Sequence, residues 1–273
     1  MLVSFRCTSL FTAPRLFGRQ RPLQPDTATI QSCVKAVSYT HLDVYKRQAV
    51  LPIGAVEQHG PHLPVGTDFI SAEDLTLLAM DQVQAEAQYL VLPTVAYALS
   101  IEHIHVPGTI TLSYQTLINT LLDIGRSLLR LGVRKLVAIN GHGGNDAALQ
   151  IAGRVLRGEG LQLYMVNGGA IRTALGAEEY HIHADKFETS AMLAMHPEMV
   201  DCSKITPELH TSIERWHKAP DCNGDLISCW YIEDIAVEGV VGDPELASVE
   251  YGKEFLRQQS KRVAAALDLA ASL

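Results

Sequence analysis

The sequence predicts an α/β protein in which a mostly parallel central sheet lies between two helical layers, a three-layer α/β/α arrangement. From residue 49 onward, short runs rich in Val, Ile and Leu alternate with longer segments of helical periodicity, which is typical of βαβ units. No stretch rich in Pro, Gly or Ser divides 49–273, and no internal repeat is present there. We therefore expect one domain over 49–273.

The first part of this domain is expected to hold two strands around one helix. An apolar strand is predicted over 49–54, and a polar loop follows it through Asp68. Residues 70–86 have apolar side chains at helical spacing, with Ser71 as the candidate cap. The apolar run 89–95 predicts the second strand.

The middle of the domain repeats the alternation. Residues 113–131 are strongly periodic and predict a helix that ends at Gly132, because glycine is common just after a helix end. The apolar run 135–140 predicts a buried strand. A helix over 146–158 and a strand over 161–166 are expected next.

The last part is expected to be helical or irregular. An apolar helix is predicted over 189–194, stopped near Pro197, and a terminal helix over 246–269. Residues 200–235 are polar and are expected to form irregular structure.

The composition is that of an ordinary globular protein, with 47% hydrophobic and 19% charged residues. No apolar run approaches the ~18 residues that span a bilayer. The net charge of −8 argues against a phosphate-binding surface, so we expect neither a membrane nor a nucleic-acid partner. The five cysteines include no CxxC pair. They favour a reducing, cytoplasmic environment over a disulfide framework.

Residues 1–48 differ in charge from the rest of the chain. They contain seven Lys or Arg and two Asp or Glu, a net charge of +5, whereas 49–273 have a net charge of −13. The arginines near the start are also typical of a mitochondrial transit peptide. However, residues 37–48 resemble a translated sequencing-adapter fragment. We expect 1–48 to be a non-native or disordered leader.

Three loops at predicted strand ends carry most of the ionisable side chains, and ligands of open α/β sheets bind outside the carboxyl ends of strands. In the first loop, Glu57 and His59 are two residues apart and leave the same face of an extended segment. Asp68 can return to them because Gly and Pro residues turn the chain. These ligand types suit Zn²⁺, Mn²⁺ or Fe²⁺. Taken alone, the loop is equally consistent with a solvated surface turn.

The second loop, 140–145, has the sequence NGHGGN and directly follows the buried strand. Its three glycines let the backbone turn sharply, and His142 projects from the strand end. A phosphate loop is a weaker interpretation, because there is no lysine and the spacing of GxxxxGK is absent. We expect His142 to be a further ligand of a metal held by the first loop.

The third stretch, 181–190, places His183 and Glu188 around an expected helix start. By itself it is better explained as a helix cap with a favourable acid in the first turn. Glu188 beside an apolar helix is nonetheless a candidate buried carboxylate, and such a group needs a partner.

Five motifs together resemble those of the creatininase (creatinine amidohydrolase) family. They are LPIGAVEQHGPHLPVGTD at 51–68, HVPGTITLS at 105–113, NGHGGN at 140–145, HADKFETS at 183–190 and GVVGDP at 239–244. Their order is that of the family, and the resemblance extends over essentially all of 49–273. The resemblance implies a three-layer α/β/α domain with a two-metal hydrolytic centre, usually in a homo-oligomer and often in a hexamer.

The resemblance also implies site residues. The implied metal ligands are Glu57, His59, Asp68 and His142. Asp68 would bridge two divalent ions, Zn, Mn or Fe, and His183 matches a catalytic histidine on the substrate side. One family ligand is missing, because creatininase proper has a glutamate where this chain has Gly144. We expect Glu188 to supply that ligand.

The expected activity is metal-assisted hydrolysis of a small molecule. Two ions lower the pKa of a bridging water toward neutrality, so that the hydroxide attacks a carbonyl carbon while His183 moves the proton. Ser100, Glu102 and His103 are expected to contact the substrate. The tryptophans that frame creatinine in the namesake enzyme have no equivalents near 180–182. We therefore expect another amide, such as a cyclic amide.

Several alternatives stay open. Some family members are thought to cleave cyclic ketones derived from an inositol, and a peptide or formamide bond is a further candidate. A noncatalytic metal-binding or regulatory subunit is the alternative outside the enzymes. Metal analysis followed by assays on cyclic amides, formamides and inosose-type ketones would separate these hypotheses.

Overall fold

The structure, a computed structural model, describes residues 47–273 except 86, 168–181, 210–228 and 237. Residues 1–46 of the expected leader lie outside the described residues. The strands are β1 (Arg47–Ile53), β2 (Gln88–Val91), β3 (Lys135–Asn140) and β4 (Gln162–Asn167). They form a sheet in the order β2-β1-β3-β4, and each neighbouring pair is parallel. The predicted parallel sheet is confirmed.

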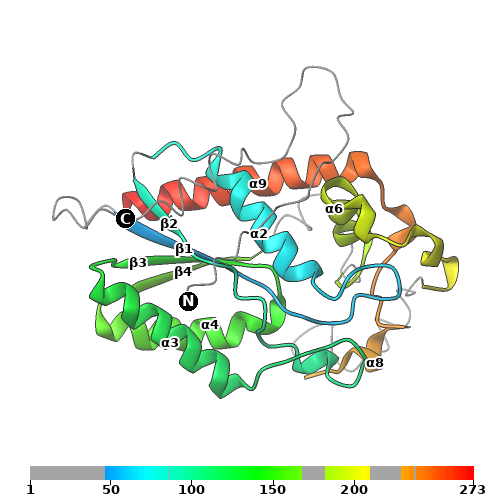
Figure 1. Ribbon diagram of the computed structural model, residues 1–273, viewed down its shortest axis with the longest axis horizontal. Helices are drawn as coiled ribbons and strands as arrows, with labels where there is room; N and C mark the ends of the chain where they lie inside the picture. Colours follow the sequence, from blue (N-terminus) through cyan, green and yellow to red (C-terminus); the bar gives the residue numbers. More distant parts are fainter. Residues whose placement is uncertain (1–46, 86, 168–181, 210–228, 237) are drawn as a thin grey trace, which may run out of the picture.

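Helices cover both faces of the sheet, which confirms the three-layer α/β/α prediction (Figure 1). One layer holds α3 (Tyr114–Arg130) and α4 (Asp146–Glu159), and the other holds α2 (Thr67–Met80) and α9 (Val249–Ser272). The helix α6 (Lys186–Met195) packs against α9. The short helices are α8 (Ile232–Ile235), η2 (Ile101–His103), η3 (Gly143–Asn145), η4 (Pro197–Met199), η5 (Cys202–Lys204), η6 (Pro207–Leu209) and η7 (Pro244–Leu246).

The core is divided by the sheet into two apolar clusters. On β3, Leu136 packs into the cluster with α3 and α4, whereas Val137 and Ile139 pack into the cluster with α9. Alternate residues of β1 divide between the two clusters in the same way. Because both faces of the strands are buried, their sequences are continuous apolar runs, as expected for a parallel sheet.

The start of α2 differs from the prediction. The helix begins at Thr67, so Ser71 lies inside it and is not its cap, and Asp68 lies in the first turn and not in a loop. The helix start packs directly onto two strand ends. A Cβ atom at Gly54 would lie 2.3 Å from the backbone nitrogen of Phe69. This close backbone packing, which the apolar pattern does not encode, brings the carboxylate of Asp68 to the strand ends.

The second strand is shorter than predicted and ends at Val91. Pro93 has no N–H to donate to a ladder. The chain rejoins β1 only at the isolated bridge between Ile53 and Val95. By contrast, α3 begins after its cap residue Ser113, and β3 has the predicted bounds.

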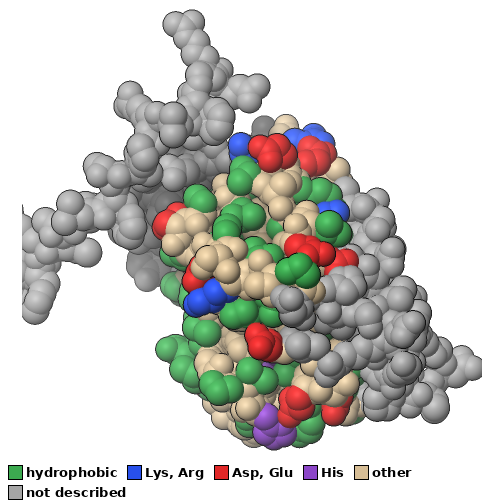
Figure 2. Space-filling view, turned by 90° about the vertical axis from the view of Figure 1, so that its right-hand side faces the viewer, with side chains coloured by type: hydrophobic (Ala, Val, Ile, Leu, Met, Phe, Trp, Pro, Cys, Tyr) green, Lys and Arg blue, Asp and Glu red, His purple; other side chains and the backbone are tan. Residues whose placement is uncertain are grey.

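The surface carries charged side chains of both signs. Figure 2 shows the face on the right-hand side of Figure 1, where acidic and basic side chains are interspersed with apolar and neutral ones. Cys202 and Cys229 are exposed and are not in disulfides. Among the described residues, no helix is long and apolar enough to cross a membrane.

Candidate metal centre

The predicted ligands meet beyond the carboxyl ends of β1 and β3. Glu57 and His59 lie in the loop after β1, His142 follows β3, Asp68 lies in the first turn of α2, and Glu188 lies in the first turn of α6. The first four residues are buried, and the side chain of Glu188 is 14% exposed. Segments far apart in the sequence therefore place three carboxylates and two imidazoles in one buried cluster.

The cluster contains two ligand sets that face different oxygens of Asp68. The Nδ1 atom of His142 lies 3.1 Å from Asp68 Oδ2 and 3.2 Å from Glu57 Oε2. The Nε2 atom of His59 lies 3.1 Å from Asp68 Oδ1 and 3.5 Å from Glu188 Oε2. Within the described residues, sets of ligand atoms lying within 4.8 Å of one another are Glu57–Asp68–His142, His59–His183–Glu188 and Glu57–His103–His183.

These residues fit divalent cations. Both carboxylate oxygens of Glu57 and the Oδ2 atom of Asp68 are buried without a well-aligned hydrogen-bond donor in the described part of the chain. A buried carboxylate oxygen without a donor is costly unless a positive charge compensates it. Carboxylate and imidazole ligands suit Zn²⁺, Mn²⁺ and Fe²⁺.

Two protonated histidines compensate the negative charge of the carboxylates. Burial by itself lowers the pKa of His59, but Asp68, Glu188 and Glu57 outweigh it and raise this pKa to about 10. Burial likewise opposes the charged form of His142, whose neighbouring carboxylates hold its pKa well above the usual value. A divalent ion would take over this compensation, and its binding would release protons from the imidazoles.

Two further histidines lie beside the cluster, and their pKa values are lowered. Burial lowers the pKa of His103 to about 3, and the neighbouring His142 adds to this effect. Burial, together with His59 and His103, holds the pKa of His183 well below its usual value. Cationic imidazoles, of His59 and His142, therefore lie between the carboxylates, and neutral imidazoles, of His103 and His183, lie beside them.

A buried asparagine, which the sequence reasoning missed, connects the loops that carry the cluster. The Nδ2 atom of Asn145 donates to the backbone oxygen of Gly54 and to Asn140 Oδ1. Its Oδ1 atom accepts from the backbone nitrogen of Leu99. The loops after β1, β2 and β3 are therefore tied together at one side chain, whose only sequence indication is its place at the end of NGHGGN.

The start of α6 holds Glu188 in place. Asp185 caps the helix by accepting from the backbone nitrogens of Phe187 and Glu188. The Oε2 atom of Glu188 accepts from the backbone nitrogen of Ala184 at 2.7 Å, and Ala184 has a left-handed φ of 50°. The helix-cap interpretation and the buried-carboxylate interpretation of this stretch therefore describe different acids.

The residues expected to contact substrate lie beside the cluster. The Oε1 atom of Glu102 lies 3.1 Å from His142 Nε2, on the side of the ring away from Glu57. A Cβ atom at Gly144 would lie 2.3 Å from Glu102 Oε1, so Glu102 takes the space beside that glycine. Ser100 is buried, with no partner for its hydroxyl in the described structure.

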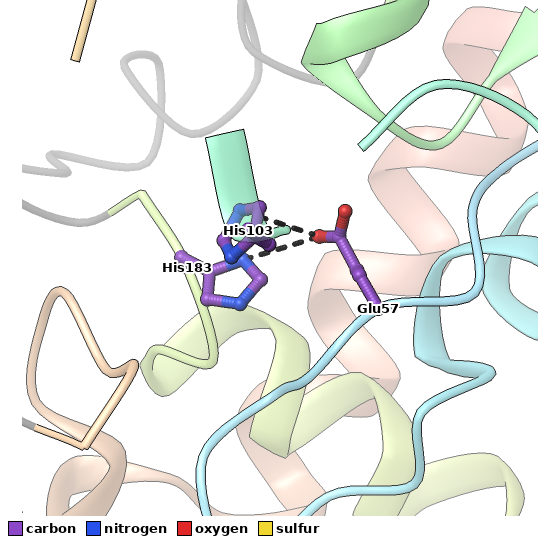
Figure 3. A group of neighbouring side chains, drawn as sticks. All are labelled: Glu57, His103 and His183. Atoms are coloured by element: carbon purple, nitrogen blue, oxygen red, sulfur yellow. Dashed lines mark ion pairs between the residues drawn. The ribbon is translucent and has the colours of Figure 1, made fainter. Parts of the chain in front are cut away.

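The rings of His103 and His183 face the same oxygen of Glu57 (Figure 3). The His183 Nδ1 atom lies 3.5 Å and the His103 Nε2 atom 3.7 Å from Glu57 Oε1. The predicted catalytic histidine is thus placed against a predicted metal ligand.

A cavity of about 360 Å³ lies next to the cluster, and Gln58 and Gly239 are among the residues that line it. Its wall is otherwise largely apolar and includes Val106 and Ile232. Glu238 also contributes to its lining. The residues expected to contact substrate, Ser100, Glu102 and His103, are not part of this wall.

Known proteins resemble this chain in sequence and fold. The family model described as creatinine amidohydrolase (Creatininase) matches residues 36–267. A mycofactocin precursor peptide peptidase from Mycobacterium ulcerans (strain Agy99) is 33% identical over 221 residues, 77% of this chain and 80% of the relative. A creatinine amidohydrolase from Pseudomonas putida is 32% identical over 178 residues, 57% of this chain and 67% of the relative.

The fold comparison agrees with the sequence comparison. A crystal structure of creatinine amidohydrolase (creatininase) has 26% sequence identity and a TM-score of 0.65, and the match covers 81% of this chain and 89% of that chain. The family match spans most of the chain and includes every residue of the cluster. The chain therefore belongs to the creatininase family and is a metal-dependent hydrolase.

Proposed function

We propose that this hydrolase cleaves an amide bond of a small molecule with two divalent ions, Zn, Mn or Fe. The proposed ligands are Glu57, His59, Asp68, His142 and Glu188. The observation that carries the proposal is the pair of ligand sets, each facing its own oxygen of Asp68. A carboxylate placed in this way is suited to bridge two ions.

The proposed site residues would have separate roles in holding the ions and in moving a proton. When bound, the ions would supply Lewis-acid polarisation of the carbonyl and would acidify water. Glu57 and His142 would hold one side of the centre, and His59 and Glu188 the other. His183 would hold or move a proton at its Nδ1 atom, which faces Glu57.

An amide substrate is supported by the relatives and by the cavity. The names of the two sequence relatives refer to creatinine, a cyclic amide, and to a peptide. The cavity of about 360 Å³ is in the range of small-molecule pockets, roughly 300–1,000 Å³. We propose a cyclic amide first, and peptide, formamide and inosose-type ketone substrates are outcomes of the assay.

The proposal is tested by metal analysis and turnover in the same samples. The panel contains creatinine, other cyclic amides, formamides, short peptides and an inosose-type ketone. Wild type should bind two ions per chain and hydrolyse at least one amide of this panel. Glu57→Gln, Asp68→Asn and His142→Ala should each lose metal and turnover. Glu73→Gln, at an exposed acid that accepts from Thr94, is the matched control.

Different results would contradict different parts of the proposal. A ligand variant that keeps full metal occupancy would refute the assignment of that ligand. Turnover of the inosose-type ketone alone would replace the amide by a ketone. Full metal occupancy without turnover of any panel member would favour the noncatalytic subunit.

We also propose that the chain forms a homo-oligomer, with a hexamer as the state that the family resemblance implies. Sedimentation equilibrium of the metal-loaded protein measures the mass directly. A mass equal to that of one chain, 29.8 kDa, at micromolar concentration would contradict this proposal.

A further inference from the structure

We propose that Gln58 is a positioning residue that determines which ring nitrogen carries the proton in His103 and in His183. The inference rests on the proposed function, because it assigns the atoms through which two histidines beside the metal centre act. Gln58 lies between Glu57 and His59 in the sequence, and it is buried.

The orientation of the Gln58 amide is fixed by two backbone groups. Its Oε1 atom accepts from the backbone nitrogen of Gly60 at 2.9 Å, and its Nε2 atom donates to the backbone oxygen of Gly239 at 3.2 Å. An N–H can only donate and a carbonyl oxygen can only accept, so the amide cannot be reversed. A Cβ atom at Gly239 would lie 2.0 Å from Gln58 Oε1, so this close approach requires glycine.

The second hydrogen of Gln58 Nε2 is then directed at His103. The Nδ1 atom of His103 lies 2.9 Å from Gln58 Nε2 and must accept this hydrogen. A neutral imidazole that accepts at Nδ1 carries its proton at Nε2. The N–H of His103 therefore faces Glu57 Oε1, and this nitrogen is not available as a metal ligand.

The backbone of Gln58 sets the orientation of His183. The Nε2 atom of His183 lies 2.7 Å from the backbone oxygen of Gln58, and because that oxygen only accepts, Nε2 carries a proton. Its contact with the Gln58 side-chain nitrogen at 3.2 Å then joins two donors and is not a hydrogen bond. His183 therefore faces Glu57 with Nδ1 (Figure 3).

One residue thus gives two neighbouring imidazoles opposite roles. Both carry the proton at Nε2, but His103 directs that N–H toward Glu57, whereas His183 directs its Nδ1 lone pair there. In amide hydrolysis, His183 Nδ1 takes the proton of water as the C–O bond forms. It returns that proton to the departing nitrogen as the C–N bond breaks. His103 keeps its proton, because its N–H faces the carboxylate of Glu57.

The test is the tautomer of His103 in the zinc-loaded protein, measured by solid-state NMR after ¹⁵N labelling of the histidines. Wild type should show a pyridine-type Nδ1 and a pyrrole-type Nε2 for His103, identified by their loss in His103→Gln. In Gln58→Glu, the carboxylate has no hydrogen to donate, so the pyridine-type signal of Nδ1 should be lost as this atom becomes protonated.

Gln82→Glu is the matched control, because Gln82 donates to Ser260 just beyond the C-terminal end of α2, whereas Asp68 of the metal centre lies at its start, and the His103 signals should stay unchanged. A protonated His103 Nδ1 in wild type would overturn the inference. Because this measurement uses wild type alone, it tests the inference even if Gln58→Glu does not fold. Unchanged His103 signals in a folded, zinc-loaded Gln58→Glu protein would also overturn it. The expected tautomers without amide turnover would refute the proposed function and leave the tautomer assignment standing.

Discussion

At the scale of single residues, the metal centre is an arrangement of charges that compensate one another in a buried space. Burial raises the pKa of Glu57 to about 7, and the neighbouring Asp68 adds to this effect against the influence of His142. For Asp68, burial acts in the same direction, but His59 and His142 outweigh it and hold its pKa well below the usual range. The helix start at Asp68 also favours a negative charge.

Glu102 is expected to support His142 and not to contact the substrate directly. A carboxylate on the second nitrogen of a metal-binding imidazole orients the ring and makes it more basic. Glu102→Gln should therefore weaken metal binding about 10–100-fold, measured by competition with a chelator. Glu73→Gln removes the same charge from an exposed position and should leave the affinity unchanged. Unaltered metal affinity with a raised KM in Glu102→Gln would instead support the substrate contact predicted from the sequence.

His62 is expected to make the metal-free protein less stable in acid. Burial lowers its pKa to about 4, whereas an unfolded histidine titrates near 6.5. Between these values the unfolded chain binds more protons, so the free energy of unfolding falls as the pH falls from about 6.5 to about 4. His62→Gln should reduce this loss, measured by urea unfolding at neutral pH and at about pH 4.5. If the exposed control His105→Gln reduces it equally, the assignment to His62 is wrong.

At the scale of elements, the helix starts decide where the acids lie. The apolar spacing predicted α6 from residue 189, but the helix begins at Lys186 because Asp185 caps it. Local polar contacts of this kind add a turn that apolar periodicity does not record. The strand 135–140 was predicted with both bounds correct, because a parallel strand buried on both faces is a continuous apolar run.

The cap of α3 gives a prediction at this scale. The hydroxyl of Ser113 accepts from the backbone nitrogen of Thr116 at 3.2 Å. Ser113→Ala should lower the free energy of unfolding by about 0.5–2 kcal/mol and leave the metal content unchanged, because α3 holds none of the proposed ligands. Ser127→Ala, in the interior of the same helix, should have a smaller effect. Equal effects of the two variants in urea unfolding would contradict the role of the cap.

At the scale of the whole molecule, the metal centre joins the sheet to one layer of helices, because its ligands come from loops after β1 and β3 and from the starts of α2 and α6. A bound ion should therefore stabilise the whole fold. With free metal at about 1,000 times Kd, the stabilisation is about 4 kcal/mol per site. Chelation should lower Tm, and Zn²⁺ or Mn²⁺ should restore it. A Tm that does not change on complete metal removal would contradict this coupling.

The predicted leader is also tested at this scale. A chain that lacks 1–46 should bind as much metal as the full chain, because β1 begins at Arg47 and the first proposed ligand is Glu57. A chain that lacks 1–53 also loses β1, which pairs with both β2 and β3, and should not fold. Loss of metal from the first of these two proteins would contradict the leader prediction.

The sequence by itself determined the alternation of strands and helices, the three layers and the meeting of the proposed ligands from the loops after β1 and β3, because parallel strands bring their carboxyl ends to one edge of the sheet. It did not determine which atoms face one another. The contact of Glu102 with His142, and the contacts of Gln58 with His103 and His183, became visible only in the tertiary structure. Gln58 is separated from these two histidines by 45 and 125 positions in the chain. No local pattern encodes such contacts, because the packing of three separate loops sets the direction of each side chain.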